Sequence, residues 1–402
     1  MTPRTPGFSF RVTARDGQAR RAVLETPHGP VDTPTFMPVG TQGSVKTLTP
    51  DEVASTGARI VLGNTYHLML RPGADVIARL GGLRAFTRWP HSMLTDSGGF
   101  QAYSLANGGS AKKPLVELAE QGFAFKSHLD GSAHTLTPED AVRVQGLLGA
   151  DIQMQLDVCP PGDSPRSVVE QAVARTTRWA KRAIATERPP GQALFGIVQG
   201  ACFADLRRAH AEELGALPFD GLALGGFSVG EPIERMHATL LEAAPALDPE
   251  RPRYVMGIGT PRDLVRAIEA GADMFDCVLP TRNARNGQAL TRHGPLVIKQ
   301  ARFRDDDRPV DEACACACCA HGYSRAYLRH LYMAGEILSL RLLSLHNLHF
   351  YGELVGGARL AIEEGRFAAW SRDALAAVGQ ADVGETQPAE GATPRARDPE
   401  PT

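Results

Sequence analysis

The stretch YVMGIGTPRDLVRAIEAGADMFDCVL, residues 254–279, indicates the class of fold. Two short apolar runs, Tyr254–Gly257 and Met274–Leu279, lie on either side of a segment with helical spacing. Thr260 followed by proline is typical of a helix N-terminus, so Pro261–Ala270 is predicted to be a helix. Apolar runs without alternation are typical of parallel strands that are buried on both faces. The stretch therefore predicts one strand–helix–strand unit.

The same design recurs along the chain. Six further apolar runs end in small or polar residues: Thr35–Gly40, Arg59–Thr65, Ser92–Gly98, Ile152–Cys159, Ala193–Gly200 and Gly221–Gly226. Between them we expect helices at Ser164–Thr186, Phe203–Leu214 and Glu231–Ala244. Eight strands with intervening helices favour a (β/α)8 TIM barrel of the α/β class over an ordinary doubly wound sheet. Active sites of such barrels lie at the C-terminal strand ends, here Asn64, Asp96, Asp157, Gln199, Gly225, Gly226, Met256 and Asp276.

The rest of the chain is predicted to decorate this barrel. We expect residues 1–300 to form the barrel, with an N-terminal hairpin at Phe8–Leu24 capping one end and an insertion around 105–140. Within the insertion, Phe123–Leu136 is typical of a hairpin with Asp130-Gly131 at its turn. Residues 301–375 are expected to form a zinc-binding subdomain and closing helices. Residues 380–402 contain four prolines and a single large aliphatic residue, Val383, which predicts a disordered tail.

The charge of the chain is unevenly distributed. The 402 residues carry 43 basic and 45 acidic side chains, a net charge of −2. Residues 279–304 nevertheless hold six basic side chains and no acidic one. Such a segment fits a surface for a polyanion such as nucleic acid as well as it fits an ordinary solvated face. With no apolar run long enough for a membrane span and no secretory signal, we expect a cytoplasmic protein without membrane contact.

Four of the seven cysteines lie within six residues, in Cys314-Ala-Cys316-Ala-Cys318-Cys319. In a reducing compartment such crowding favours metal ligation over disulfides. Cys314, Cys316 and Cys319 would supply three thiolates, and His346, beyond a helix predicted at Ser324–Ser344, can fold back as the fourth ligand. Four protein ligands make a closed, structural zinc site. Cys318 would be a spare thiol, and His321 is a weaker competitor for the place of His346.

Three aspartates are predicted at the same barrel mouth. Asp96 lies in TDSGGFQ, Asp157 follows IQMQL, and Asp276 stands between Phe275 and Cys277. Each alone would read as a helix cap or an ion-pair partner, but three together favour catalysis. Two carboxylates beside an anomeric carbon are typical of glycosyl chemistry, one as nucleophile and one as proton carrier. Because no Walker A, dinucleotide-binding or serine-hydrolase motif appears, phosphoryl transfer, hydride transfer and serine hydrolysis lose support.

Several long motifs occur in one order along the chain. They are LTDSGGFQ (94–101), FGIVQG (195–200), LGGFSVGEP (224–232), MGIGTPRDL (256–264), MFDCVLPTRNARNG (274–287) and the CxCxxC…SRAYLRHL…HN block. From about Phe8 to Trp370 the chain resembles the bacterial tRNA-guanine transglycosylases, also called queuine tRNA-ribosyltransferases. The resemblance implies a TIM barrel with a zinc-binding subdomain and a homodimer. It further implies a pentosyltransferase of queuosine biosynthesis. Such an enzyme exchanges guanine at the wobble position of GUN-anticodon tRNAs (Asp, Asn, His, Tyr) for preQ1, 7-aminomethyl-7-deazaguanine.

The resemblance also implies roles for individual residues. Asp276 resembles the nucleophile that forms the covalent ribosyl-enzyme, and Asp96 the general acid/base. Asp157, Gln199 and the Gly226 backbone resemble groups that bind the base edge, with Phe100 and Met256 covering its two faces. The implied base-binding set is Asp96, Ser97, Gly98, Gly99, Phe100, Asp157, Gln199, Gly225, Gly226 and Met256. The implied RNA-contacting set is Gly257, Ile258, Gly259, Thr260, Pro261, Arg262, Asp263, Thr281, Arg282, Asn283, Ala284 and Arg285, which overlaps the basic segment.

The chain departs from the family pattern at a few positions. Phe227 stands where the family usually has leucine, which can alter the pocket wall near the aminomethyl group. The zinc block carries the additional Cys318 and one residue more than usual before Ser324. Cys159 and Val229 match the bacterial pattern, and no archaeal-type RNA-binding domain follows Trp370. These features favour preQ1 over queuine or preQ0.

Three other functions remain open at the level of sequence. A non-catalytic RNA-binding subunit of a transglycosylase heterodimer is disfavoured because both Asp96 and Asp276 are present. A zinc-dependent barrel hydrolase would need an open metal position at the barrel mouth, whereas these ligands follow the last strand and look closed. The same chemistry on another base or another tRNA position is separated less well by the sequence.

Overall fold

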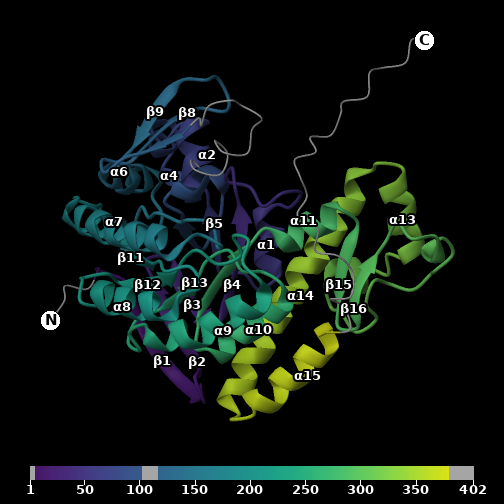
Figure 1. Cartoon of the computed structure of the whole chain (residues 1–402). Coiled ribbons are helices and arrows are strands. Elements are labelled where there is room, and N and C mark those ends of the chain that lie inside the picture. The colour runs from purple at the N-terminus through teal and green to yellow at the C-terminus, as the bar shows by residue number, and fades with distance from the viewer. Residues whose placement is uncertain (1–4, 102–115, 380–402) are drawn as a thin grey trace.

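The structure is a computed structural model that describes residues 5–101 and 116–379 (Figure 1). The predicted tail at 380–402 lies outside the described residues, as does the part of the predicted insertion at 105–115. No helix within the described ranges combines the length and apolar character that a membrane crossing requires.

Eight parallel strands close into a barrel, as the sequence predicts (Figure 1). The order around the barrel is β10-β11-β12-β13-β14-β4-β5-β6, and β14 pairs with β4 to close it. The strands are β4 Thr35–Gly40, β5 Ile60–Gly63, β6 Ser92–Thr95, β10 Ile152–Met154, β11 Ala193–Val198, β12 Gly221–Leu224, β13 Arg253–Val255 and β14 Met274–Cys277. All eight predicted strands are present, but most are shorter than the apolar runs. The ends of those runs form buried loops instead of ladder pairs.

Helices surround the barrel and connect its strands. Thr260 caps α10 by accepting a hydrogen bond from the Asp263 N–H, and Asp263 bonds back to the cap, as a capping box requires. The helices up to the last barrel strand are α1 Pro50–Ser55, α2 Thr65–Leu70, α3 Ala74–Arg79, α4 Gly82–Thr87, α6 Pro138–Leu148, α7 Arg166–Ala185, α8 Ala204–Gly215, α9 Ile233–Ala243 with the 3-10 turn η1 Ala244–Ala246, and α10 Pro261–Glu269. The four helices predicted between strands are all found, with bounds shifted by a few residues.

The N-terminal segment closes the end of the barrel opposite the mouth. Its strands β1 Ser9–Asp16 and β2 Ala19–Thr26 form the predicted hairpin, and β3 Gly29–Thr33 adds a third strand. Phe8, Leu24 and Val31 pack into the interior of the barrel. Phe8 meets Phe195 of β11 edge to face, with ring centroids 5.9 Å apart. The sheet therefore fills the bottom of the barrel with its own side chains.

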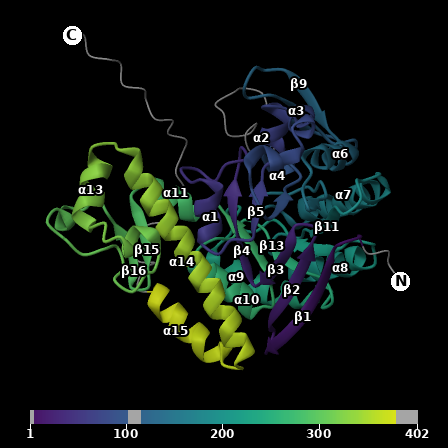
Figure 2. The same ribbon diagram turned by 180° about the vertical axis from the view of Figure 1, so that it is seen from behind.

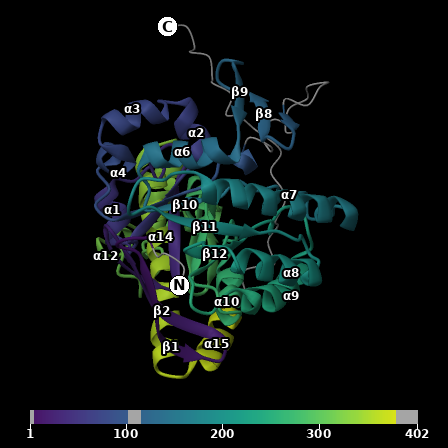
Figure 3. The ribbon, with the colours of Figure 1, turned by 90° about the vertical axis from the view of Figure 1, so that its left-hand side faces the viewer.

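The insertion forms a small antiparallel sheet on the other side of the barrel (Figure 3). Its strands are β7 Val116–Leu118, β8 Phe123–Lys126 and β9 Ala133–Leu136. The predicted Asp130-Gly131 turn connects β8 to β9, and Gly131 takes the left-handed conformation with φ 75°. Asp130 accepts the N–H of Ser132, which stabilises the turn.

The C-terminal part folds beside the barrel and ends on it (Figure 2). It contains β15 Gln288–Thr291, β16 Gly294–Val297, η2 Ala301–Phe303, α11 Leu279–Arg285, α12 Ala317–Ala320, α13 Arg325–Met333, α14 Ile337–Glu363 and α15 Phe367–Gly379. The prediction of one helix over Ser324–Ser344 is wrong. The chain breaks after α13 because Gly335 adopts φ 77°, and α14 then continues well past His346. His346 therefore lies within a helix and not beyond one.

Candidate active site

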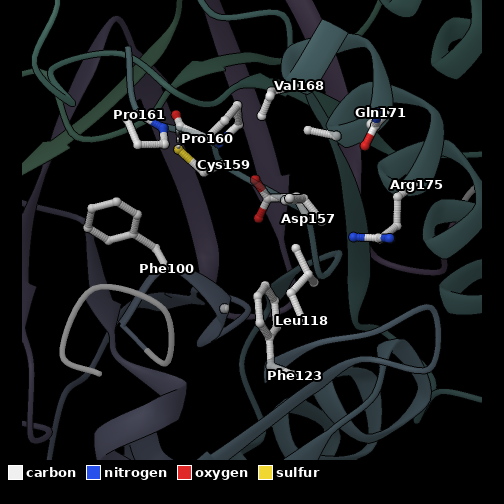
Figure 4. A pocket seen from close by; sticks show the side chains of 13 residues that line it. Phe100, Leu118, Phe123, Asp157, Cys159, Pro160, Pro161, Val168, Gln171 and Arg175 are labelled. Carbon is white, nitrogen blue, oxygen red and sulfur yellow. Dashed lines mark hydrogen bonds between the residues drawn. The ribbon is translucent and has the colours of Figure 1, made fainter. Parts of the chain in front are cut away.

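The C-terminal ends of the barrel strands surround a cavity of about 280 Å³. Nine of the ten residues predicted to bind the base line this cavity together with the predicted nucleophile: Asp96, Ser97, Gly98, Phe100, Asp157, Gln199, Gly225, Gly226, Met256 and Asp276. Gly99 instead lines an adjoining cavity that shares Phe100, Asp157 and Cys159 with the first. Figure 4 shows Asp157 in the wall of this second cavity, with Phe100 on one side and Arg175 on the other.

Asp96 follows β6 and receives hydrogen bonds on both carboxylate oxygens. Asn64 donates to Oδ2 at 2.6 Å, while the N–H groups of Thr65 and Gly98 donate to Oδ1 at 2.9 and 3.1 Å. Burial nevertheless raises the pKa of Asp96 to about 7, and the nearby carboxylate of Asp276 adds to the rise. Asp96 therefore exchanges a proton readily near neutral pH, as a general acid and base must.

Asp276 lies at the end of β14 and is held through one oxygen. The Tyr254 hydroxyl donates to Oδ1 at 2.5 Å, and the Gly257 N–H donates to the same atom at 2.8 Å. Desolvation raises the pKa of Asp276, and these two hydrogen bonds lower it. Among the described residues no donor contacts Oδ2. This oxygen is left free to attack an electrophile in the cavity.

Asp157 and Gln199 form a polar edge on the opposite wall. The Gln199 Nε2 donates to Asp157 Oδ2 at 2.6 Å, and burial raises the pKa of Asp157 to about 6. The Gln199 Oε1 is buried without a partner among the described residues. Gly225 and Gly226 leave room for this side chain, since a Cβ on either residue would come within 2.7 Å of it. This wall thus offers both hydrogen-bond donors and acceptors to the cavity, which suits the polar edge of a heterocycle.

Three cysteines and one histidine converge in the C-terminal part of the chain. The Nδ1 of His346 lies 3.6, 3.5 and 3.4 Å from the sulfur atoms of Cys314, Cys316 and Cys319. A tetrahedral zinc ion with ordinary Zn–S and Zn–N bonds separates such atoms by about 3.5 Å. All four ligand atoms lie within 4.8 Å of one another, and all four residues are buried. Cys318 and His321 are not part of this group.

The second ring nitrogen of His346 supports the same interpretation. Its Nε2 bonds the Leu290 carbonyl at 2.7 Å, which fixes the ring so that Nδ1 faces the three sulfur atoms. The residues therefore fit a closed metal site with four protein ligands and no position for water. Such a metal ion holds the fold together and supplies no chemistry at the barrel mouth.

A family model described as "Queuine tRNA-ribosyltransferase" matches residues 16–380 of the chain. The chain belongs to this family. It is 69% identical over 381 residues to a queuine tRNA-ribosyltransferase of Sorangium cellulosum, a match that covers 95% of this chain and 94% of that protein. It is 53% identical to one of Nitratidesulfovibrio vulgaris, covering 92% and 96%, and 50% identical to one of Cereibacter sphaeroides, covering 94% and 99%.

In this queuine tRNA-ribosyltransferase family member, the segments expected to contact RNA lie beside the cavity, at α10 and α11. Gly257 and Arg282 are exposed, and Asn283 and Arg285 are half-buried. The side chains of Ile258, Asp263, Thr281 and Ala284 are buried in the fold. Any contact of these four with RNA would therefore not run through their side chains in this conformation.

Sequence reasoning missed Tyr254, Arg207 and His210. The sequence pattern places Tyr254 only within a strand, although a hydroxyl on a buried strand needs a hydrogen-bond partner. Arg207 and His210 lie on α8 at the helical spacing of the apolar residues Phe203, Ala211 and Leu214. Polar side chains on the apolar face of a helix were the signal that could have identified these two.

Proposed function

We propose that this chain exchanges the guanine at the wobble position of GUN-anticodon tRNAs for preQ1. The pair of Asp96 and Asp276 in one cavity carries this proposal. The pKa of Asp96 lies near neutrality, and one oxygen of Asp276 is unbonded among the described residues. Both side chains line the cavity whose far wall is the polar edge of Asp157 and Gln199.

The reaction follows from these two carboxylates as a double displacement. Oδ2 of Asp276 attacks C1′ of the target nucleotide while the bond from C1′ to the guanine nitrogen breaks. Protonated Asp96 gives its proton to the leaving guanine, which diffuses away and leaves a ribosyl ester on Asp276. The ionised Asp96 then takes a proton from the incoming base. The base nitrogen attacks C1′ and releases Asp276, so no external energy source is required.

The proposed base site binds the heterocycle both along its polar edge and over its two faces. Gln199, Asp157 and the Gly226 N–H would bind the edge of the ring, with Phe100 and Met256 over its faces. Glu231 accepts the N–H groups of Ser228 at 2.5 Å and Val229 at 2.9 Å. Because a trans peptide directs its carbonyl opposite to its N–H, the Phe227 carbonyl points away from Glu231. We assign this carbonyl as the acceptor for the ammonium group of preQ1.

The remaining partners belong to the same proposal. Residues 257–263 and 281–285 would contact the RNA, with Arg282 and Arg285 binding phosphates. The metal in the Cys314, Cys316, Cys319 and His346 site would be zinc, one per chain, supporting the fold.

We place the barrel at residues 1–300 and the metal-bearing part at 301–375, although β15 and β16 already pack into the hydrophobic cluster of the second part.

We also propose a homodimer. Three apolar side chains on α13 and at the start of α14 are 40%, 60% and 71% exposed: Tyr327, Met333 and Ile337. Pairing of two chains through α13 and the start of α14 would bury these side chains. Light scattering at micromolar concentration is expected to give twice the chain mass, and a monomer there contradicts this part of the proposal.

The test of the function is incorporation of radiolabelled guanine into an unmodified GUN-anticodon tRNA. Wild type is expected to incorporate label, and Asp276→Asn is expected to incorporate none while binding the tRNA as wild type does. Displacement of bound label by unlabelled preQ1, and not by queuine, tests the choice of base. A folded, metal-loaded wild type that binds tRNA without incorporating guanine would support the non-catalytic subunit instead.

A further inference from the structure

Helix α8 carries two buried polar side chains beneath the base cavity, and neither lines that cavity. They are Arg207 and His210, both on the face that packs against the barrel. His210 Nδ1 accepts the backbone N–H of Gln199 at 2.9 Å. Burial lowers the pKa of His210 to about 4, so the ring is neutral and its Nδ1 remains an acceptor. His210 therefore fixes the backbone of Gln199, which is one of the residues proposed to bind the edge of the base.

Arg207 binds the backbone of two strand ends at once. Its Nε donates to the carbonyl of Ala201, which follows β11, at 2.6 Å. Its NH1 donates to the carbonyl of Val198, the last residue of β11, at 3.3 Å. Its NH2 donates to the carbonyls of Gly225 at 2.9 Å and Gly226 at 3.2 Å, just past β12. The guanidinium thus ties the loop that follows Gln199 to the loop that contains Gly226.

The geometry of the peptide bond gives these contacts a consequence for the ligand. In a trans peptide the N–H points opposite to the carbonyl of the same unit. The carbonyls of Gly225 and Gly226 both point at Arg207, so the N–H groups of Gly226 and Phe227 both point away from it. No acceptor among the described residues contacts either N–H. Gly226 and Phe227 also line the base cavity.

Phe227 completes the arrangement. The Arg207 guanidinium lies over the Phe227 ring, 3.9 Å from its centroid. Both side chains are buried, and no carboxylate within the described ranges forms an ion pair with Arg207, although the charge of Glu231 favours its protonated form. The direct partners of the Arg207 guanidinium are therefore four carbonyls and one aromatic face. A leucine at position 227 would leave that face of the guanidinium uncovered.

We propose that Arg207, covered by Phe227, is a positioning residue for base recognition. It does not touch the base. It aims the two backbone N–H groups of Gly226 and Phe227 at an acceptor of the bound heterocycle, such as the carbonyl oxygen of guanine. This inference rests on the proposed function, because it assumes that a guanine-like base occupies the cavity.

The test compares Arg207→Met and Arg207→Lys with wild type in guanine exchange, with Arg208→Met as the matched control because Arg208 is an exposed neighbour on the same helix. Misaiming the N–H groups of the site is expected to raise the KM for guanine by about tenfold in Arg207→Met, with partial recovery in Arg207→Lys. We expect kcat and the KM for tRNA to change by less than about twofold, because Asp96 and Asp276 keep their hydrogen bonds. Arg208→Met should match wild type.

Several outcomes would overturn the inference. A folded Arg207→Met with wild-type KM for guanine would do so, as would a fall in kcat alone, which indicates lost active protein. Where Arg207→Met does not fold, Phe227→Leu keeps the four carbonyl contacts and uncovers the guanidinium. Calorimetry with guanine should then show affinity weakened by about threefold, and unchanged affinity refutes the role of the stack. Loss of exchange in wild type and Arg208→Met together refutes the proposed function instead, while guanine binding by calorimetry still tests Arg207.

Discussion

The hydroxyl of Tyr254 offers the sharpest test of the proposed nucleophile. Tyr254→Phe removes one of the two donors on Oδ1 of Asp276 and leaves the Gly257 N–H in place. The hydrogen bond stabilises the ionised carboxylate, so its loss raises the pKa of Asp276. In the proposed mechanism exchange requires ionised Asp276, and the acid limb of the pH–rate profile is therefore expected to move to higher pH.

The size of the effect follows from the kind of bond that is lost. A hydrogen bond to a charged group contributes about 1.5–3 kcal/mol, which corresponds to about tenfold to hundredfold in an equilibrium constant. On the acid limb the exchange rate of Tyr254→Phe should fall by that factor. It should recover partly as the pH rises and Asp276 ionises. In the same mechanism the alkaline limb reflects loss of the proton from Asp96, whose pKa of about 7 comes mainly from burial, and this limb should stay in place.

The assay is guanine exchange into tRNA under single-turnover conditions across pH, with Tyr332→Phe as a control. Tyr332 lies on α13, away from the cavity, and its loss of a hydroxyl should leave both limbs unchanged. An acid limb of Tyr254→Phe that coincides with that of wild type would refute the reasoning. So would a loss of activity that is equal at every pH, since that would indicate damage unrelated to ionisation of Asp276.

Two further predictions concern the metal site and the barrel base. His346→Ala should abolish stoichiometric zinc and lower the melting temperature, because the ligands lie in the core of the C-terminal part, whereas Cys318→Ala should retain one zinc per chain. Zinc loss from Cys318→Ala would contradict the ligand assignment. Asp273→Asn should cost about 3–5 kcal/mol in urea unfolding, because it leaves the buried Arg20 guanidinium, whose Nε donates to Asp273 at 2.9 Å, without its counter-charge. The exposed Asp32→Asn should cost less than about 1 kcal/mol, and equal costs would refute the argument from burial.

The barrel could be predicted from the sequence because its strands are buried on both faces. Each strand appears in the sequence as an unbroken apolar run. The polar residue that follows it, such as Asp96 or Gln199, indicates the end of the strand at the mouth of the barrel. The metal ligands could be predicted because cysteines at that spacing have few other uses. The break between α13 and α14 could not, since the apolar spacing continues through Gly335 and a single glycine is tolerated within helices.

Other features of the site depend on contacts between distant segments. Nothing local to Tyr254 indicates that its hydroxyl meets Asp276 on the neighbouring strand. Arg207 lies on a helix whose sequence is amphipathic, and its partners are carbonyls of two loops beyond it. Every residue has a backbone carbonyl, so the residue types in those two loops do not indicate that their carbonyls bind Arg207. Such arrangements follow from the fold and not from a motif.

The closure of the barrel constrains the order in which the chain can fold as it is synthesised. β4, the first barrel strand in the chain, pairs with β14, the last, with Thr35 opposite Met274, and α14 packs across β1, β2 and β4. A nascent chain that has released only the first strands has no partner for the open edge of β4. Completion of the hydrophobic core must therefore wait until α14 leaves the ribosome. Until then exposed strand edges invite chaperone binding or aggregation, and chains terminated before α14 should be cleared as misfolded.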